Sequence, residues 1–183
     1  MRAGSAARSS LFCVVIACAF TSAAADEPRF LEFDNGERLG YVVHIHPADA
    51  HLPEASAILK PRNALSTAKL VTQYLAEGKI EDASLLSNAP KARYERLRES
   101  FEGWSDSDFR RAFGRYFDVE NRIVAEVQIH GHRLLIWHLK DTDHLAAFFL
   151  VQVEDRMLLD DVPNETRANL RKVLQAYRDG KAK

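Results

Sequence analysis

Apolar positions recur with two different periods along the chain, and the change of period separates a helix-forming part from a strand-forming part. Between Ala64 and Phe117, apolar side chains recur at the spacing of one helix face. Between Asn121 and Val162, they recur at alternate positions, as on one face of a strand. Helices followed by hairpin-connected strands predict an α+β fold, in which helices pack on one face of a curved antiparallel sheet of about four strands.

The first part predicts four helices, separated by residues that end or begin helices. They cover 64–77, 79–87, 91–104 and 105–117. Gly78 ends the first helix, and Ser105 opens the last because its side chain can cap the following backbone N–H groups. Aromatic residues recur at helical spacing in the last two helices, so we interpret them as core: Tyr94, Phe101, Trp104, Phe109, Phe113, Tyr116 and Phe117.

The second part predicts four antiparallel strands and one further helix. The strands cover 121–129, 132–140, 144–153 and 157–162. Gly131 is expected to supply positive φ at the tip of the first hairpin, so we interpret His130 and His132 as solvated turn residues. Asn164 caps the closing helix, whose apolar face contains Leu170, Val173, Leu174 and Tyr177.

Residues 26–63 are expected to form a hairpin and a linker ahead of the main domain, 64–183. Asn35 and Gly36 favour a tight turn because both tolerate positive φ. The β-rich run from Leu39 to His46 ends at Pro47, and the proline-containing stretch 47–63 predicts a linker over the surface. By its length, 26–183 is expected to form one globular unit.

Residues 1–25 have the features of a secretory signal peptide. Arg2 and Arg8 precede an apolar run, 11–20, that is too short to span a bilayer as a helix. Small residues then lead to Ala25, which predicts cleavage after Ala25 and a periplasmic or secreted protein. The alternative is a lipoprotein signal in which Cys18 becomes lipidated and anchors the protein to the outer membrane. No later segment is apolar and long enough to span a membrane.

Composition removes several classes of function. The chain has 25 Lys and Arg against 26 Asp and Glu, so no basic excess attracts nucleic acid or an anionic membrane. Both cysteines, Cys13 and Cys18, lie in the predicted signal, which leaves no disulfide or thiol nucleophile in the mature chain. Phosphate-loop, dinucleotide and nucleophile-elbow motifs are absent, so no cofactor is expected.

Two stretches are similar to one known superfamily. "TAKLVTQYLAEGKIEDASLLS" resembles the opening helices of small exported members of the cone-shaped superfamily that includes nuclear transport factor 2 and ketosteroid isomerase, and "FFLVQVEDRMLLDDV" resembles their final hairpin. The resemblance covers roughly 64–162. It implies a helix-covered sheet used as a binding cup, and ketosteroid isomerases use a tyrosine and acidic groups in such a cavity. None of those catalytic residues aligns to a position here, and the superfamily also includes many non-enzymes.

Three N-terminal histidines form a candidate metal site. His44 and His46 alternate along a predicted strand, so both side chains lie on one face, about 6.5–7 Å apart along the chain. His51 lies close enough in sequence to serve as a third ligand for zinc or copper. The alternative is a polar, solvated strand face opposite the apolar Tyr41, Val43 and Ile45.

Strand register predicts that His138 lies on the apolar, helix-facing side of the sheet. A two-residue turn at Gly131 places its ring close to Ala125 and Ala147, where small neighbours leave space. One interpretation is a core histidine with a single hydrogen-bond partner. The other is a cavity histidine, oriented by Asp160 or Asp161, that acts as a general base or a ligand anchor.

These features favour an exported, non-enzymatic domain that binds a small apolar ligand or a protein partner. The first alternative is a small hydrolase or isomerase that uses His138 with Asp160 or Asp161. The second is a metal-binding protein that uses His44, His46 and His51. A homodimer formed through the sheet is a further hypothesis about partners.

Overall fold

The computed structural model describes residues 26–32, 36–52 and 60–182. The predicted signal peptide, 1–25, lies outside these residues, and so does Cys18 of the lipoprotein alternative. Asn35 of the predicted turn and the central part of the predicted linker, 53–59, also lie outside them. The predictions of cleavage and lipidation therefore stay predictions. None of the described helices is long and apolar enough to cross a membrane.

Six strands form one antiparallel sheet in which each strand pairs with its neighbours in the sequence. They are β1 (Asp26–Glu32), β2 (Arg38–His44), β3 (Arg122–Ile129), β4 (His132–Leu139), β5 (His144–Val153) and β6 (Arg156–Leu159). The prediction of about four strands with an extra N-terminal hairpin is roughly right, since the hairpin is present but belongs to the same six-stranded sheet. The N-terminal hairpin extends the sheet because Val42, Val43 and His44 of β2 pair with β3.

Five α-helices accompany the sheet in the described part of the chain. They are α1 (Ala64–Ala76), α2 (Ile80–Ser84), α3 (Pro90–Ser100), α4 (Asp106–Gly114), which continues as a 3-10 turn over Arg115–Phe117, and α5 (Glu165–Arg178). Side chains fix the helix starts: Asn63 and Ser105 each form a reciprocal capping box, and Asn164 accepts a hydrogen bond from the backbone N–H of Arg167. Each helix predicted from periodicity is present, with somewhat different ends.

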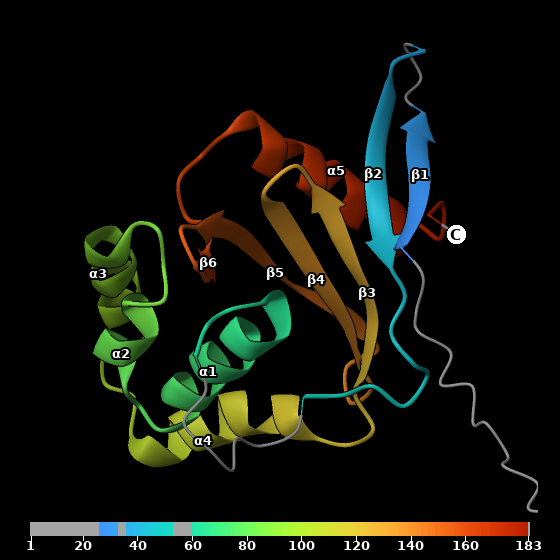
Figure 1. Ribbon diagram of the computed structural model, residues 1–183. Coiled ribbons are helices and arrows are strands. Elements are labelled where there is room, and N and C mark those ends of the chain that lie inside the picture. The colour runs from blue at the N-terminus through green and yellow to red at the C-terminus, as the bar shows by residue number, and fades with distance from the viewer. Residues whose placement is uncertain (1–25, 33–35, 53–59, 183) are drawn as a thin grey trace, which may run out of the picture.

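Helices cover both faces of the sheet (Figure 1). On one face, α1 packs on Leu135, Trp137 and Leu139, and this core also takes in side chains of α4 and of the turn that follows it. This confirms the prediction that the helical part packs on one face of the sheet. On the other face, α5 packs on Leu134 and Ile136. Alternate side chains of β4 therefore contribute to two separate cores.

Two predicted assignments of burial are wrong. Trp104, interpreted as core, is 39% exposed, and α3 buries none of its residues. Conversely, the predicted surface linker enters the core: Leu52 is only 2% exposed, and the carbonyl of Ala50 accepts a hydrogen bond from the backbone N–H of Ile123. Extended segments without regular structure can contribute core side chains that periodicity does not reveal.

A β-bulge at Val124 changes which residues share a face. Ile123 lies opposite Trp137, but the next pair is Ala125 and Ile136, so Val124 has no partner in the ladder. The extra residue sends Ile123 to the α1 core and Ala125 to the α5 core. A bulge of this kind resets the alternation of one strand against its neighbour.

Candidate functional site

His138 lies at the end of β4, away from the helix-covered position predicted for it. It lies opposite Arg122 and Leu145, whereas Ala125 and Ala147 are opposite Ile136. Its side chain is 36% exposed, and Nε2 lies 2.7 Å from a carboxylate oxygen of Asp143. The prediction of a largely buried His138 beside Ala125 and Ala147 is wrong, because Trp137 takes the α1 side and the bulge displaces the pairing.

The aspartates predicted to orient His138 have other partners. Among the described residues, His138 makes no hydrogen bond or ion pair with Asp160 or Asp161, and the carboxylate that it contacts is the exposed Asp143. The predicted catalytic pairing of His138 with Asp160 or Asp161 is therefore not formed. An exposed pair at a hairpin turn contributes little orienting energy because solvent competes for both groups.

Asp160 pairs instead with His132 at the start of β4. Its side chain is 1% exposed, and one oxygen lies 3.0 Å from Nδ1 of His132. Asn88 donates a hydrogen bond of 3.0 Å to the other oxygen. Asn164 donates a hydrogen bond of 3.1 Å to the oxygen that His132 contacts. His132, interpreted from the sequence as a solvated turn residue, is therefore part of a buried polar cluster. The residue with positive φ in its hairpin is His130, at 51°, rather than Gly131.

Asp161 connects the end of the sheet to α3. Its side chain is 8% exposed, accepts a hydrogen bond of 2.7 Å from Ser87, and forms ion pairs with Arg93 at 3.0 Å and Arg96 at 2.9 Å. Burial by itself would raise the pKa of Asp161, but the two arginines and the Ser87 hydroxyl outweigh it and lower the pKa below its usual value. Asp161 thus attaches a helix that buries no side chain of its own.

The three histidines of the predicted metal site do not converge. The rings of His44 and His46 are in contact, with centroids 5.0 Å apart, but His44 binds Asp26 and His51 binds the backbone carbonyl of Asp49. Within residues 26–32, 36–52 and 60–182, no three His, Cys, Asp or Glu side chains are grouped closely enough to hold a metal ion. The three-ligand site predicted from His44, His46 and His51 is therefore not formed.

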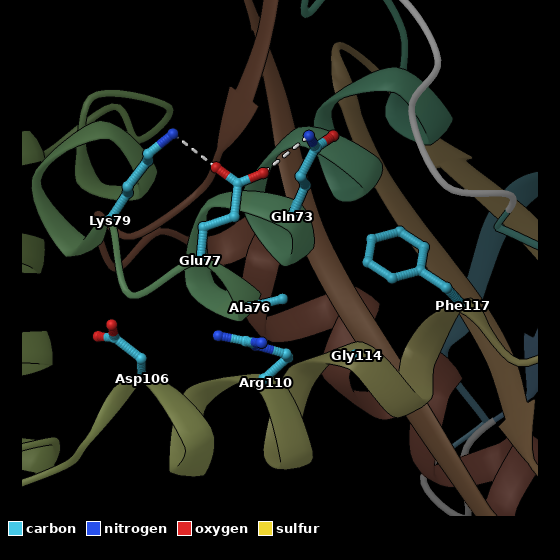
Figure 2. Close-up of a pocket in the computed structure, with 8 residues that line it drawn as sticks. All are labelled: Gln73, Ala76, Glu77, Lys79, Asp106, Arg110, Gly114 and Phe117. Carbon is cyan, nitrogen blue, oxygen red and sulfur yellow. Dashed lines mark hydrogen bonds and ion pairs between the residues drawn. The ribbon is translucent and has the colours of Figure 1, made fainter.

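A groove between α1 and α4 is a candidate space for a ligand. It has a volume of about 470 Å³, within the range typical of small-molecule sites. Figure 2 shows charged side chains gathered at one end and Phe117 at the other. The lining residues are Gln73, Ala76, Glu77, Lys79, Asp106, Arg110, Gly114 and Phe117.

The polar groups of the groove fall into two sets. Glu77 is occupied: Lys79 lies 2.6 Å from one oxygen, and Gln73 donates a hydrogen bond of 3.0 Å to the other. These two contacts lower the pKa of Glu77, so it stays a carboxylate. By contrast, Arg110 and Asp106 have no hydrogen bond or ion pair from their side chains among the described residues, and Oε1 of Gln73 is buried without a partner. Oε1 of Gln73 is therefore a buried acceptor that a ligand could satisfy, whereas Asp106 and Arg110 are exposed charges that a ligand could pair with.

Sequence reasoning missed both the groove and the His132–Asp160 cluster. The groove joins α1 to α4, and the cluster joins residues 28 positions apart. The only local signal is the aspartate pair at 160–161, and in the structure Asp160 pairs with His132 rather than with His138. No spacing within one element could have indicated either arrangement.

Comparison with known proteins gives no relative for this chain: no protein-family model, no curated protein and no solved structure matches it. The resemblance to the cone-shaped superfamily therefore stays a prediction.

Proposed function

We propose that this protein is an exported, non-enzymatic binding protein whose small ligand occupies the groove between α1 and α4. The observation that carries the proposal is the combination of an apolar end with an unpaired guanidinium. Phe117, Ala76 and Gly114 line the groove together with Arg110, which has no acidic partner among the described residues. Sites of this kind bind the apolar body of a ligand by burial and fix its orientation with a few polar groups.

Glu77 is already neutralised by Lys79, which leaves Asp106 and Arg110 as the charged lining residues without a partner among the described residues. Of these two, Arg110 is the group that can bind an anionic head. A guanidinium prefers carboxylate, sulfonate or phosphate groups because its N–H donors match two oxygens at once. We therefore infer an amphiphilic ligand, apolar at the Phe117 end and anionic at the Arg110 end. The unpartnered Oε1 of Gln73 would accept a hydrogen bond from a hydroxyl or amide of the same ligand.

The structure gives less support to the other two hypotheses. A hydrolase or isomerase based on His138 with Asp160 or Asp161 would need those groups together, and the contacts of His138 and Asp160 are instead with Asp143 and His132. A metal protein based on His44, His46 and His51 would need three converging rings, and His51 points to the backbone of Asp49.

A fluorescent probe with the proposed chemistry tests the site. Anilinonaphthalene sulfonate is an aromatic anion, and we expect it to bind the folded protein at one saturable site. Arg110→Ala should weaken binding about tenfold, the loss expected for one charge-assisted contact of about 1.4 kcal/mol. Arg111→Ala is the matched control, since Arg111 lies next in the sequence, is largely exposed and pairs with Asp108.

A second variant fills the groove without disturbing the helix. Gly114 has a helical φ of −60°, and a Cβ added there meets no atom within 4 Å. Gly114→Leu should therefore keep the melting temperature, because leucine favours a helix more than glycine does, and should remove dye binding by occupying the apolar end. Unchanged dye affinity in both Arg110→Ala and Gly114→Leu would reject the groove as the binding site.

A further inference from the structure

Helix α5 lies on the face of the sheet opposite α1 and α4 (Figure 1). Two of its arginines share one aromatic ring. Arg167 and Arg171 lie one helical turn apart, and their guanidinium carbons lie 5.7 Å and 6.0 Å from the centroid of Phe149 on β5. Cation–π contact of this kind holds a guanidinium against a ring without using its N–H donors. Both side chains therefore stay anchored while their donors remain available.

Neither guanidinium has an anionic partner of its own. In the described part of the chain, no hydrogen bond or ion pair is made by the side chain of Arg167 or Arg171, and Nε of Arg167 is buried without an acceptor. The nearby carboxylates are engaged elsewhere: Asp160 by His132, Asn88 and Asn164, and Asp161 by Ser87, Arg93 and Arg96.

This arrangement is unfavourable for the protein alone. Burial lowers the pKa of Arg167 and the like charge of Arg171 lowers it further, whereas the charges of Asp160 and Asp161 raise it without outweighing the first two. A buried N–H donor without an acceptor is also costly, because it has lost its water and gained nothing in return. An anion bound between the two guanidinium groups would offset their repulsion.

We propose that Arg167 and Arg171 form a binding site for an oxyanion of the phosphate or sulfate class, built on the ring of Phe149. Two adjacent guanidinium groups offer more donors than a single carboxylate can accept, whereas a tetrahedral dianion has oxygens for both. Asp160 and Asp161 act on Arg167 only through their charge, since their oxygens are bound by Asn88 and Ser87 among other partners. The site is separate from the groove, since α5 and α4 pack on opposite faces of the sheet.

Titration with inorganic phosphate tests the site directly. We expect saturable binding by calorimetry and a rise in melting temperature at constant ionic strength, with sulfate acting similarly and acetate much more weakly. Arg167→Gln and Arg171→Gln should each weaken phosphate binding by about tenfold or more, as removal of a bidentate charged partner does. Arg111→Gln, which makes the same charge change on α4, should bind phosphate as the native protein does.

The melting temperature without phosphate separates a binding role from a structural one. If the two arginines form an anion site, Arg171→Gln should be about as stable as the native protein in phosphate-free buffer, because removal of the like charge offsets loss of the cation–π contact with Phe149. A loss of stability in that buffer, with the phosphate response unchanged, would overturn the proposal. So would a phosphate response that equal ionic strength of sodium chloride reproduces.

Comparison of inorganic phosphate with a phosphate ester distinguishes the two sources of the anion, a free ion and a phosphorylated organic molecule. Glycerol 3-phosphate carries the same group as an ester, and tighter binding than that of inorganic phosphate would assign the site to a phosphorylated organic molecule. Equal or weaker binding would assign it to the free ion. Absence of binding for phosphate, sulfate and the ester alike would reject the site, and would leave the groove between α1 and α4 unaffected, because that groove is tested with a different probe and different variants.

Discussion

At the scale of single residues, the contribution of a carboxylate to stability depends on its burial and its hydrogen-bond partners. Asp160 is almost fully buried and receives hydrogen bonds from three side chains, whereas Asp143 contacts His138 with 94% of its own side chain exposed. Both aspartates touch a histidine, yet only one of these contacts is shielded from water. Buried charged groups with complete partners order the structure around them, and exposed pairs contribute little.

This difference predicts unequal costs for two matched substitutions. Asp160→Ala should lower the free energy of unfolding by about 2–4 kcal/mol, because it leaves His132, Asn88 and Asn164 without their shared acceptor. Asp143→Ala should cost about 1 kcal/mol or less, since water replaces the contact with His138 and only the positive φ of 47° at this position disfavours alanine. Urea denaturation followed by circular dichroism measures both. Equal losses in the two variants would contradict the assignment of Asp160 as the buried centre of the cluster.

At the scale of elements, α3 is attached mainly by polar contacts, and its Leu97 packs against the α1 core while only partly buried. None of its residues is buried, and Arg93 and Arg96 reach from it to Asp161. By contrast, α1 buries seven residues between the sheet and α4. Local opening occurs first where few apolar contacts hold an element, so α3 is the helix most easily released.

Hydrogen exchange should report this difference. We expect amides of α3 to exchange faster than those of α1 in the native protein, and Arg93→Met to accelerate exchange in α3 while α5 stays protected. Arg98→Met is the control on the same helix, because Arg98 makes no ion pair with another described residue. If both methionine variants accelerate α3 equally, or neither does, the ion pair with Asp161 does not hold this helix in place.

At the scale of the whole molecule, helices on both faces leave the sheet exposed chiefly at its edges. The edge strand β1 contains Pro28 and the charged Asp26, Glu27 and Arg29. Proline and charges on an edge strand oppose the addition of a further strand. A homodimer formed through the sheet stays a prediction, and it would have to overcome these features of β1.

Export is predicted to leave the fold complete. Cleavage after Ala25 would make Asp26 the first residue, and Asp26 is also the first residue of β1 that pairs, opposite His44. Intact-mass measurement of protein purified from its producing cells should therefore give a chain that begins at Asp26. A diacylglycerol-modified chain that begins at Cys18 would instead establish the lipoprotein alternative.

The sequence by itself determined the elements and their order. The helical spacing from Ala64 to Phe117 and the alternation from Asn121 to Val162 have physical causes that act within one element, because one face must be apolar to pack. Helix caps such as Asn63, Ser105 and Asn164 are local in the same way, since each bonds a backbone group three residues away or less. These features could be predicted because no distant residue is needed to form them.

Only the tertiary structure decided which elements meet, and with it both candidate sites. The bulge at Val124 moved Ile123 to one core and Ala125 to the other, and periodicity could not indicate it because a bulge breaks the alternation on which the prediction rests. Helices pack on both faces of the sheet, which places Trp137 in one core. His138 lies near the end of β4, where its side chain is 36% exposed. Asp160 met His132 rather than His138, and Arg110 reached a groove with α1, because packing joins side chains that are far apart along the chain.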